Sequence, residues 1–257
     1  MTLTLTLALG SVIGILLGLL GGGGSILAVP VLVYALGIPL EQAVPMSLLV
    51  VGIASLFGAI PKVAARQVQW RVAAVFAATG FLAAFAGGAV NRILPPAVTM
   101  TGFAAVMVVA GIRMLSETSG TGTACRVEGS GINWRRCTSR AIPAGLGVGF
   151  LTGLFGVGGG FLIVPALVLL LGIEMSVAVG TSLVIVTANS GSGLVAYLGD
   201  LTLDWGVVAA FTVTAIAGSL VAGRFGQRID RARLQKWFAY LIFAVAAFVV
   251  FQVIVVT

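Results

Sequence analysis

The sequence lacks histidine and carries little charge of either sign. Charged residues make up 8% of the 257 residues, whereas a soluble globular domain carries about 25%. The only cysteines are Cys125 and Cys137. They lack the neighbours that a metal site needs, and we expect free thiols in a reducing compartment. These absences exclude histidine-based acid–base catalysis and argue against a membrane enzyme, so we expect no catalytic residue, metal or cofactor.

Long uncharged apolar runs take the place of the missing charge. Hydrophobic residues make up 60% of the chain and the mean hydropathy is +1.18; many runs reach the ~20 residues of a membrane-spanning helix. They are continuously apolar, without the alternation of β-barrel strands. The basic residues that give the net charge of +7 lie between the apolar runs, where such residues set the topology. We therefore expect no nucleic-acid partner. The composition predicts an all-α polytopic membrane protein in contact with a lipid bilayer.

Eight apolar segments follow one another, and a polar stretch divides them into two groups of four. The segments span residues 3–38, 42–60, 70–90, 97–115, 141–173, 175–198, 205–223 and 237–256. The polar stretch 116–140 is rich in Gly, Ser and Thr, as linkers are. We expect a first transmembrane repeat at 1–115, a linker at 116–140 and a second transmembrane repeat at 141–257.

The two groups of segments repeat one another. Residues 18–58 align with residues 153–193 at a constant offset of 135 without a gap, and nearly half of the aligned pairs are identical. Two apolar helices share leucines by chance, but here glycines and prolines also coincide, as Pro30 and Pro165 do. The chain therefore contains two homologous repeats.

The first segment of each repeat is too long for one membrane crossing. Segment 3–38 has 36 residues, which is ~54 Å as one helix, whereas the hydrocarbon core is about 30 Å thick. Glycine clusters at 21–25 and 156–160 interrupt both long segments, and each glycine costs a helix about 1 kcal/mol relative to alanine. We expect two short helices joined at a glycine-rich bend in each case.

The basic residues decide between two topologies. If all eight segments cross once, the fourteen Lys and Arg residues divide eight to six between the two sides. If both long segments turn back at their glycine clusters, the division becomes thirteen to one, in agreement with the positive-inside rule and with a cytoplasmic linker at 116–140. Each repeat then holds a helical hairpin plus three spanning helices, and the repeats are inverted, a common plan of transporters. Eight simple spans in parallel repeats are the alternative.

The glycine clusters are the candidate binding site. Non-helical backbone is tolerated inside a bilayer only where protein or a water-filled cavity covers it. Half-helices that begin at Ser25 and Gly160 would present unpaired N–H groups suited to an oxyanion. The alternative role of the glycines is close packing of helices. With nearby polar side chains included, the candidate substrate-binding residues are Gly21, Gly22, Gly23, Gly24, Ser25, Ser47, Gly156, Gly158, Gly159, Gly160, Thr181, Ser182 and Asn189.

A doubled motif carries a resemblance to a known family. The pattern G-x-x-G-x-G-G-G, followed by an apolar residue and x-x-x-P-x-L, occurs at 153–167 and, with Ser25 in place of the last glycine, at 18–32. Gly180-Thr181-Ser182-Leu183 supplies a G-T-S-L element. In these features the chain resembles the TauE/SafE family of sulfite exporters, also called the TSUP family. The resemblance implies transport of sulfite, sulfoacetate or a related organosulfonate across a bacterial inner membrane.

The residues and the resemblance together predict a secondary transporter, an exporter of a small sulfur-containing anion that works by alternating access. The alternative is a non-transporting assembly or scaffold component of the membrane. No charged residue lies deep inside a segment, so the sequence does not identify the coupling ion, whether proton or sodium. It is also compatible with a homo-oligomer.

An accessibility scan with single cysteines tests the topology. The hairpin topology places residues 200–204 on the side opposite to both 116–140 and 228–236. A membrane-impermeant thiol reagent applied to intact cells should therefore label cysteines at 200–204 alone. Eight simple spans place 228–236 opposite the other two stretches, so labelling of 228–236 from outside would contradict the hairpins.

Overall fold

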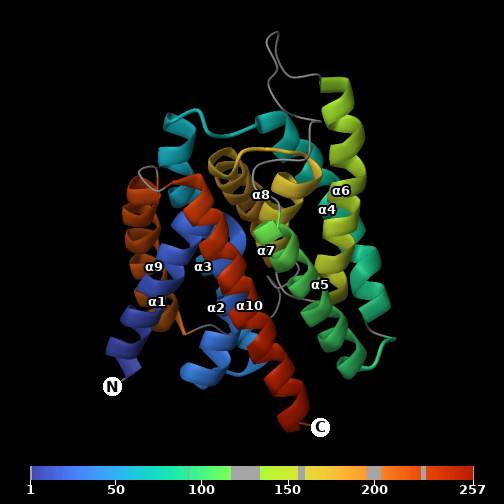
Figure 1. The fold of residues 1–257 in the computed structure, drawn as a ribbon. Coiled ribbons are helices and arrows are strands. Elements are labelled where there is room, and N and C mark those ends of the chain that lie inside the picture. The colour runs from blue at the N-terminus through green and yellow to red at the C-terminus, as the bar shows by residue number, and fades with distance from the viewer. Residues whose placement is uncertain are drawn as a thin grey trace.

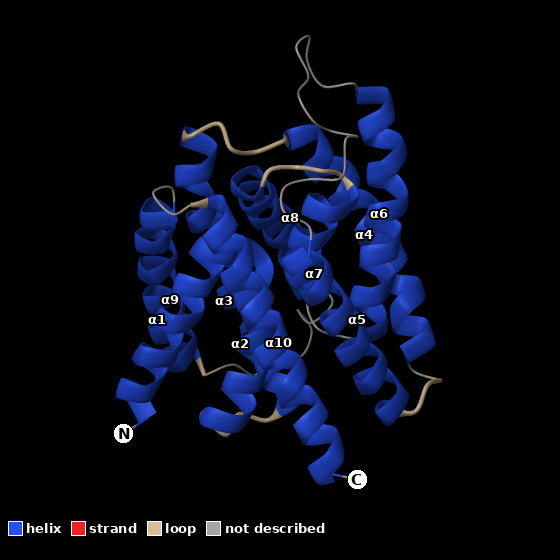
Figure 2. Cartoon of the chain, in the orientation of Figure 1, coloured by secondary structure: helices blue, strands red, loops and turns tan. Residues whose placement is uncertain are grey.

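The computed structural model describes residues 2–91, 93–116, 134–155, 160–195, 204–226 and 230–256, and every regular element in these ranges is helical (Figure 2). The α-helices are α1 (Thr2–Leu20), α2 (Ser25–Pro30), α3 (Leu40–Ala64), α4 (Trp70–Asn91), α5 (Pro96–Ser116), α6 (Trp134–Phe155), α7 (Gly160–Pro165), α8 (Met175–Val195), α9 (Trp205–Gly226) and α10 (Arg231–Val256). A 3₁₀ helix, η1 (Gly21–Gly24), and two π-helices, η2 (Val31–Ala35) and η3 (Ala166–Leu170), complete them.

These helices form a multi-pass membrane protein. Within the described residues, seven helices are long and apolar enough to cross a bilayer, and a shorter apolar helix covers Gly160–Leu170. The prediction of an all-α polytopic membrane protein is confirmed. Two helices begin before their apolar segments: α6 begins at Trp134, inside the polar stretch 116–140, and α10 begins at Arg231. Basic residues are tolerated there because the end of a membrane helix leaves the hydrocarbon.

The secondary structure repeats with the same offset of 135 as the sequence. The pairs α2 and α7, α3 and α8, α4 and α9, and α5 and α10 each begin 135 residues apart. A proline, Pro30 or Pro165, ends each short helix. A π-helix follows it. Gly37 and Gly172 come next, with φ of 68° and 69°, a conformation that glycine adopts without steric cost.

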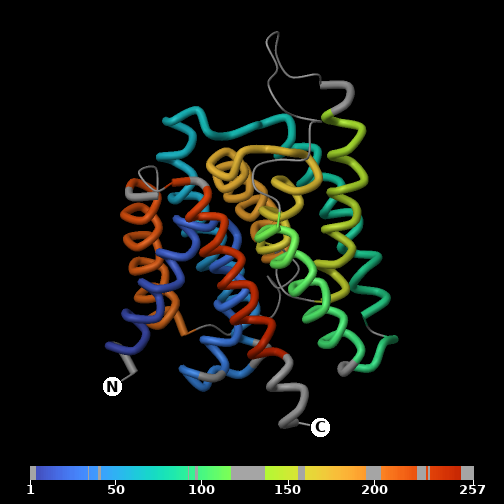
Figure 3. The backbone as a smooth tube through the Cα atoms, viewed as in Figure 1, coloured from blue at the N-terminus to red at the C-terminus, as the bar shows by residue number. Residues whose placement is uncertain are grey.

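The chain turns back at η1. In Figure 1, α1 rises from the N-terminus into the bundle, and α2 and η2 return toward the end from which α1 came. α3 then crosses to the opposite end, where α4, α6 and α10 begin; α7 and η3 run back toward that end, as the tube in Figure 3 also shows. We call the end that carries both termini the termini end and the other the far end. The orientation of the two halves across a bilayer stays a prediction.

Glycines on α1 and α6 let these helices lie at backbone distance from a helix of the other half. A Cβ on Gly14 would meet the carbonyl group of Ala215 in α9, and a Cβ on Gly149 would meet the carbonyl group of Gly80 in α4. Both contacts are related by the offset of 135. Small residues are the usual means by which membrane helices approach closely, so these glycines, outside the two clusters, serve packing.

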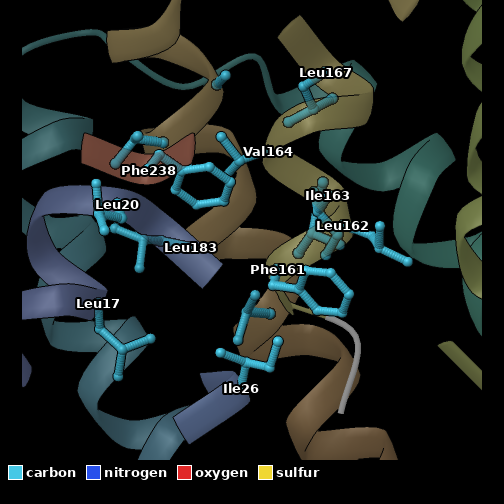
Figure 4. Packing of buried hydrophobic residues seen from close by; sticks show 14 of the residues in the cluster. Leu17, Leu20, Ile26, Phe161, Leu162, Ile163, Val164, Leu167, Leu183 and Phe238 are labelled. Carbon is cyan, nitrogen blue, oxygen red and sulfur yellow. The ribbon is translucent and has the colours of Figure 1, made fainter. Parts of the chain in front are cut away.

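Apolar side chains of the hairpins fill the centre of the bundle. Leu17 and Leu20 of α1, Ile26 of α2 and Phe161 of α7 are all buried, and Phe238 of α10 lies beside them (Figure 4). Lipid tails are as apolar as these side chains, so close packing rather than exclusion of water holds the hairpins in place.

Cys137 departs from the expectation of free thiols. It is buried near the start of α6 and is disulfide-bonded, while the only other cysteine, Cys125, lies outside the described residues. The expectation is therefore wrong for Cys137. Disulfides persist mainly in oxidising compartments, which bears against the predicted cytoplasmic side of the linker, and the cysteine scan above decides the matter.

Substitution of Gly149 by leucine should destabilise the protein, whereas substitution of Gly147 should not. The added side chain at 149 collides with the backbone of Gly80, while a Cβ at 147 meets no atom within 4 Å. Overpacking of this kind costs about 1–3 kcal/mol or more. Thermal unfolding of the two variants in detergent measures the difference, and equal melting temperatures would contradict the close contact of α4 and α6.

Candidate functional site

The first hairpin reverses direction at Gly21. This residue follows the end of α1 and has φ of 69°, which is costly for a residue with a side chain. The turn Gly21–Gly24 is fully buried, and α2 begins at Ser25 as predicted. The N–H of Ser25 donates to the carbonyl group of Gly22, so the prediction of an unpaired N–H at Ser25 is wrong. In a 3₁₀ helix, the N–H groups without a partner inside that helix are those of its first residues.

The tips of the two hairpins touch through their backbones. A Cβ on Gly22 would meet the carbonyl group of Gly160, the first residue of α7. Conversely, a Cβ on Gly160 would lie 2.5 Å from Oγ of Ser25 and 2.9 Å from the carbonyl oxygen of Gly22. Only glycine permits backbones to approach this closely. The structure thus brings members of the two predicted clusters together.

Ser182 joins this contact from α8. A Cβ on Gly21 would meet its Oγ. The Ser182 hydroxyl donates to the carbonyl group of Val179 at 2.8 Å, and the Ser25 hydroxyl donates to that of Gly22 at 2.6 Å. Among the described residues, each hydroxyl is bonded to its own helical segment. Such a bond is local, and rotation about χ1 can redirect the hydroxyl hydrogen to a ligand.

A cavity of about 700 Å³, here called cavity one, lies beside the first hairpin tip. Its polar lining consists of Ser25, Ser47, Asn91, Thr99 and Ser190. The rest of the lining is apolar and includes two phenylalanines from α5 and α6 whose rings meet edge to face at 5.3 Å between centroids. A cavity of this size is typical of sites for small organic ligands.

A second cavity of about 760 Å³, cavity two, is lined by Asn189. It shares Val44, Leu48 and Ser190 with cavity one. Leu48 lies against α8, since a Cβ on Gly193 would be 3.3 Å from its Cδ1. The side chains of Leu48 and Ser190 therefore form part of the partition between the cavities. No charged residue lines either cavity within the described part of the chain.

Both cavities lie toward the termini end. Much of their lining comes from the first half of α3 and the last part of α8, which lie at that end in Figure 1, while cavity two also extends along α4 as far as Phe76. At the far end, the α3–α4 loop packs onto α8: the N–H of Gln69 donates to Oγ1 of Thr181 at 3.1 Å. Thr181 therefore serves the closed far end and does not join the hairpin contact.

The remaining candidate residues either pack closely against other parts of the protein or lie outside the described residues. A Cβ on Gly23 would be 3.0 Å from the Phe238 ring, and one on Gly24 would be 2.7 Å from the carbonyl oxygen of Ile13. Both glycines thus have the packing role that the sequence left open. The remaining members of the second cluster, Gly156, Gly158 and Gly159, lie outside the described residues.

Sequence reasoning missed two polar residues. Asn91 ends α4, lines cavity one and donates from Nδ2 to the carbonyl group of Leu154; the neighbouring Arg92 marked it as a loop residue. Lys62 was placed in the loop after segment 42–60 because it is charged. It lies within α3, however, and is only 2% exposed. A small and polar stripe, Ser55, Gly58 and Lys62 at helical spacing, was the available signal.

Hairpins that meet at glycine backbones, polar-edged cavities beside them and seven candidate spans are the features of a membrane transporter. The family model described as Sulfite exporter TauE/SafE matches residues 6–249. The chain belongs to this family and is a membrane transporter of the TauE/SafE type.

Named relatives agree with this class. The chain is 32% identical over 254 residues to a probable membrane transporter protein of Xylella fastidiosa strain Temecula1, covering 98% of this chain and 96% of the relative. It is 33% identical over 256 residues to one from strain 9a5c of the same species, with the same coverage. The probable membrane transporter protein YdhB of Bacillus subtilis is 22% identical over 224 residues, covering 87% of this chain and 90% of the relative. No solved structure matches the chain.

Proposed function

We propose that this protein is a secondary transporter in the bacterial inner membrane that exports a small sulfur-containing anion, such as sulfite, sulfoacetate or a related organosulfonate, by alternating access. Its family is described as sulfite exporters, and its relatives are named probable membrane transporters. The two hairpin tips contact one another through their backbones at Gly22 and Gly160. This observation is the main support for placing the anion site at these residues.

The hairpin tips suit an anion because they offer positive potential without a charged side chain. Each tip starts a half-helix, and a helix N-terminus carries about half a positive charge on its N–H groups. Two such tips meet at Gly22 and Gly160, and the hydroxyls of Ser25 and Ser182 lie at the same contact. In surroundings of low dielectric, these neutral donors bind an anion more strongly than they would in water.

A difference between the two ends of the bundle supports the proposal of alternating access, although an almost wholly apolar cavity of about 550 Å³ also lies beside the last turns of α3. Cavities one and two lie toward the termini end, while the α3–α4 loop is bonded to α8 at the far end through Gln69 and Thr181. Transport then needs this bond to break when the far end opens. Inverted repeats supply such an exchange, because one half can adopt the arrangement that the other half has left.

Cavity one favours an anion with an organic part. Its volume is about 700 Å³ and its lining is mostly apolar. Sulfite, with three oxygens and no carbon, would leave most of this apolar lining without contact. A sulfonate on a short carbon chain would place its charged group at the hairpin tip and its carbons against the apolar wall. Among the proposed substrates, sulfoacetate-like compounds therefore fit this cavity better than sulfite.

Flux measurements in proteoliposomes test the function through Ser47. Ser47 lines cavity one and its hydroxyl donates to the carbonyl group of Val44 at 2.7 Å. Ser47→Leu fills part of the cavity and should lower sulfoacetate flux by about tenfold or more. Ser47→Ala leaves the space open and should change flux by no more than about tenfold, the contribution of one neutral hydrogen bond.

The matched control is Leu56→Phe, which enlarges an apolar side chain on the same helix at a position that is 52% exposed. It should transport as the unaltered protein does. If the unaltered protein carries neither sulfite nor sulfoacetate, the transport proposal fails and the scaffold alternative gains. If Ser47→Leu transports normally, cavity one lies off the route.

A further inference from the structure

Lys62 is an almost fully buried lysine without an ion-pair partner among the described residues. It lies in the last turn of α3, inside a candidate membrane span, and is only 2% exposed. No described residue forms an ion pair or a side-chain hydrogen bond with its ammonium group. A buried charge is expensive unless it is paired. Lys236, the only other lysine of the chain, is exposed at the same end of the bundle.

The loop that follows Lys62 also contains incompletely paired side chains. The N–H of Gln67 donates to the carbonyl group of Lys62 at 2.8 Å, which folds the α3–α4 loop back over the end of α3. The Oε1 atoms of Gln67 and Gln69 are both buried without a hydrogen-bond partner among the described residues. A half-turn of each amide places Nε2 where Oε1 lies, so both side chains can become donors.

Helix α8 forms the other wall of this cluster. A Cβ on Gly180 would lie 3.1 Å from Cβ of Lys62 and would meet the carbonyl group of Gln67. The next residue, Thr181, accepts the N–H of Gln69 at 3.1 Å, and Ser182 lies at the hairpin contact. The Lys62 cluster and the proposed anion site thus lie at the same turn of α8, on different faces of this helix.

A purely structural role does not account for this lysine. The negative end of the α3 dipole offers only about half a charge, and only 2% of the Lys62 surface is exposed, so the side chain has little freedom to extend toward lipid headgroups. An anion that enters between the α3–α4 loop and α8 would pair with the ammonium and with both amides. It would then lie next to the hairpin tips.

From these contacts we infer that Lys62, with Gln67 and Gln69, is a second anion-binding site, which receives the transported oxyanion at the far end of the bundle. This inference rests on the proposed function. In the present structure the α3–α4 loop closes the site, and opening of the far end exposes it. Lys62 thereby places an amino group, which an incoming anion would favour in its charged form, at the end where cavities one and two are absent.

The test compares Lys62→Met, Lys62→Arg and the control Lys236→Met in sulfoacetate flux and in thermal unfolding. Lys62→Met should raise the KM for sulfoacetate presented at the far end by roughly tenfold to a hundredfold, the effect of losing a charged hydrogen bond. Lys62→Arg should retain most transport, and Lys236→Met should match the unaltered protein.

Thermal unfolding separates binding from structure. Without anion, Lys62→Met should unfold at the same temperature as the unaltered protein or higher, because it removes an unpaired buried charge. It should also lose part of the stabilisation that sulfoacetate gives the unaltered protein. Misfolding or a lower melting temperature of Lys62→Met would show a structural lysine and overturn the inference, as would an unchanged KM. Absence of flux in the unaltered protein would instead overturn the proposed function.

Discussion

The backbone contact between Gly22 and Gly160 is the constraint on which the rest of the structure depends. Each hairpin must turn back inside the bundle, where unpaired backbone groups cost most. By placing Gly160, the first residue of α7, against the first turn, the fold covers that turn with protein instead of lipid. No side chain fits at this contact, which explains why glycines occupy both turns. The same contact sets the position of Ser25 and Ser182, and with them the proposed anion site.

Other glycines lie on the first helix of each hairpin, where it packs on the other half. Gly14 and Gly149 bring the first arms of the hairpins against α9 and α4, so each repeat is held by the other. Because α1 packs on α9 and α6 packs on α4, we expect the two halves to depend on one another for folding. Helices α3 and α8 pack against each other. The partition at Leu48 lies in the first half of α3 and the cluster at Lys62 lies in its last turn, about 20 Å apart at 1.5 Å per residue. Helix α3 therefore spans the proposed route from cavity to far end.

Much of this arrangement could be predicted from the sequence. The excess length of segment 3–38 and its glycines predicted a break, and the offset of 135 located its counterpart. Helix starts at Ser25 and Gly160 followed, because glycine and serine are poor helix residues and good helix ends. The serines at 47 and 182 were proposed as polar residues near the breaks, and the structure places them at cavity one and at the hairpin contact respectively.

What sequence could not provide is contact between distant residues. Gly22 and Gly160 lie far apart in the chain, and Thr181 points away from its neighbour Ser182 because consecutive helical residues face different directions. Lys62 and Asn91 were assigned to loops because a polar residue at the end of an apolar run usually marks the membrane boundary. Their burial depends on helices from the other repeat, which periodicity within one segment does not reveal.

Crystals grown with selenite test the central claim, that the meeting hairpin tips hold the anion. Selenite has the pyramidal shape and charge of sulfite, and selenium is located directly by anomalous scattering. The account predicts an anomalous peak at the contact of the hairpin tips, within hydrogen-bond distance of backbone N–H groups near Gly22 or Gly160. A protein that transports sulfite but shows selenite only elsewhere, away from both hairpin tips, would contradict it.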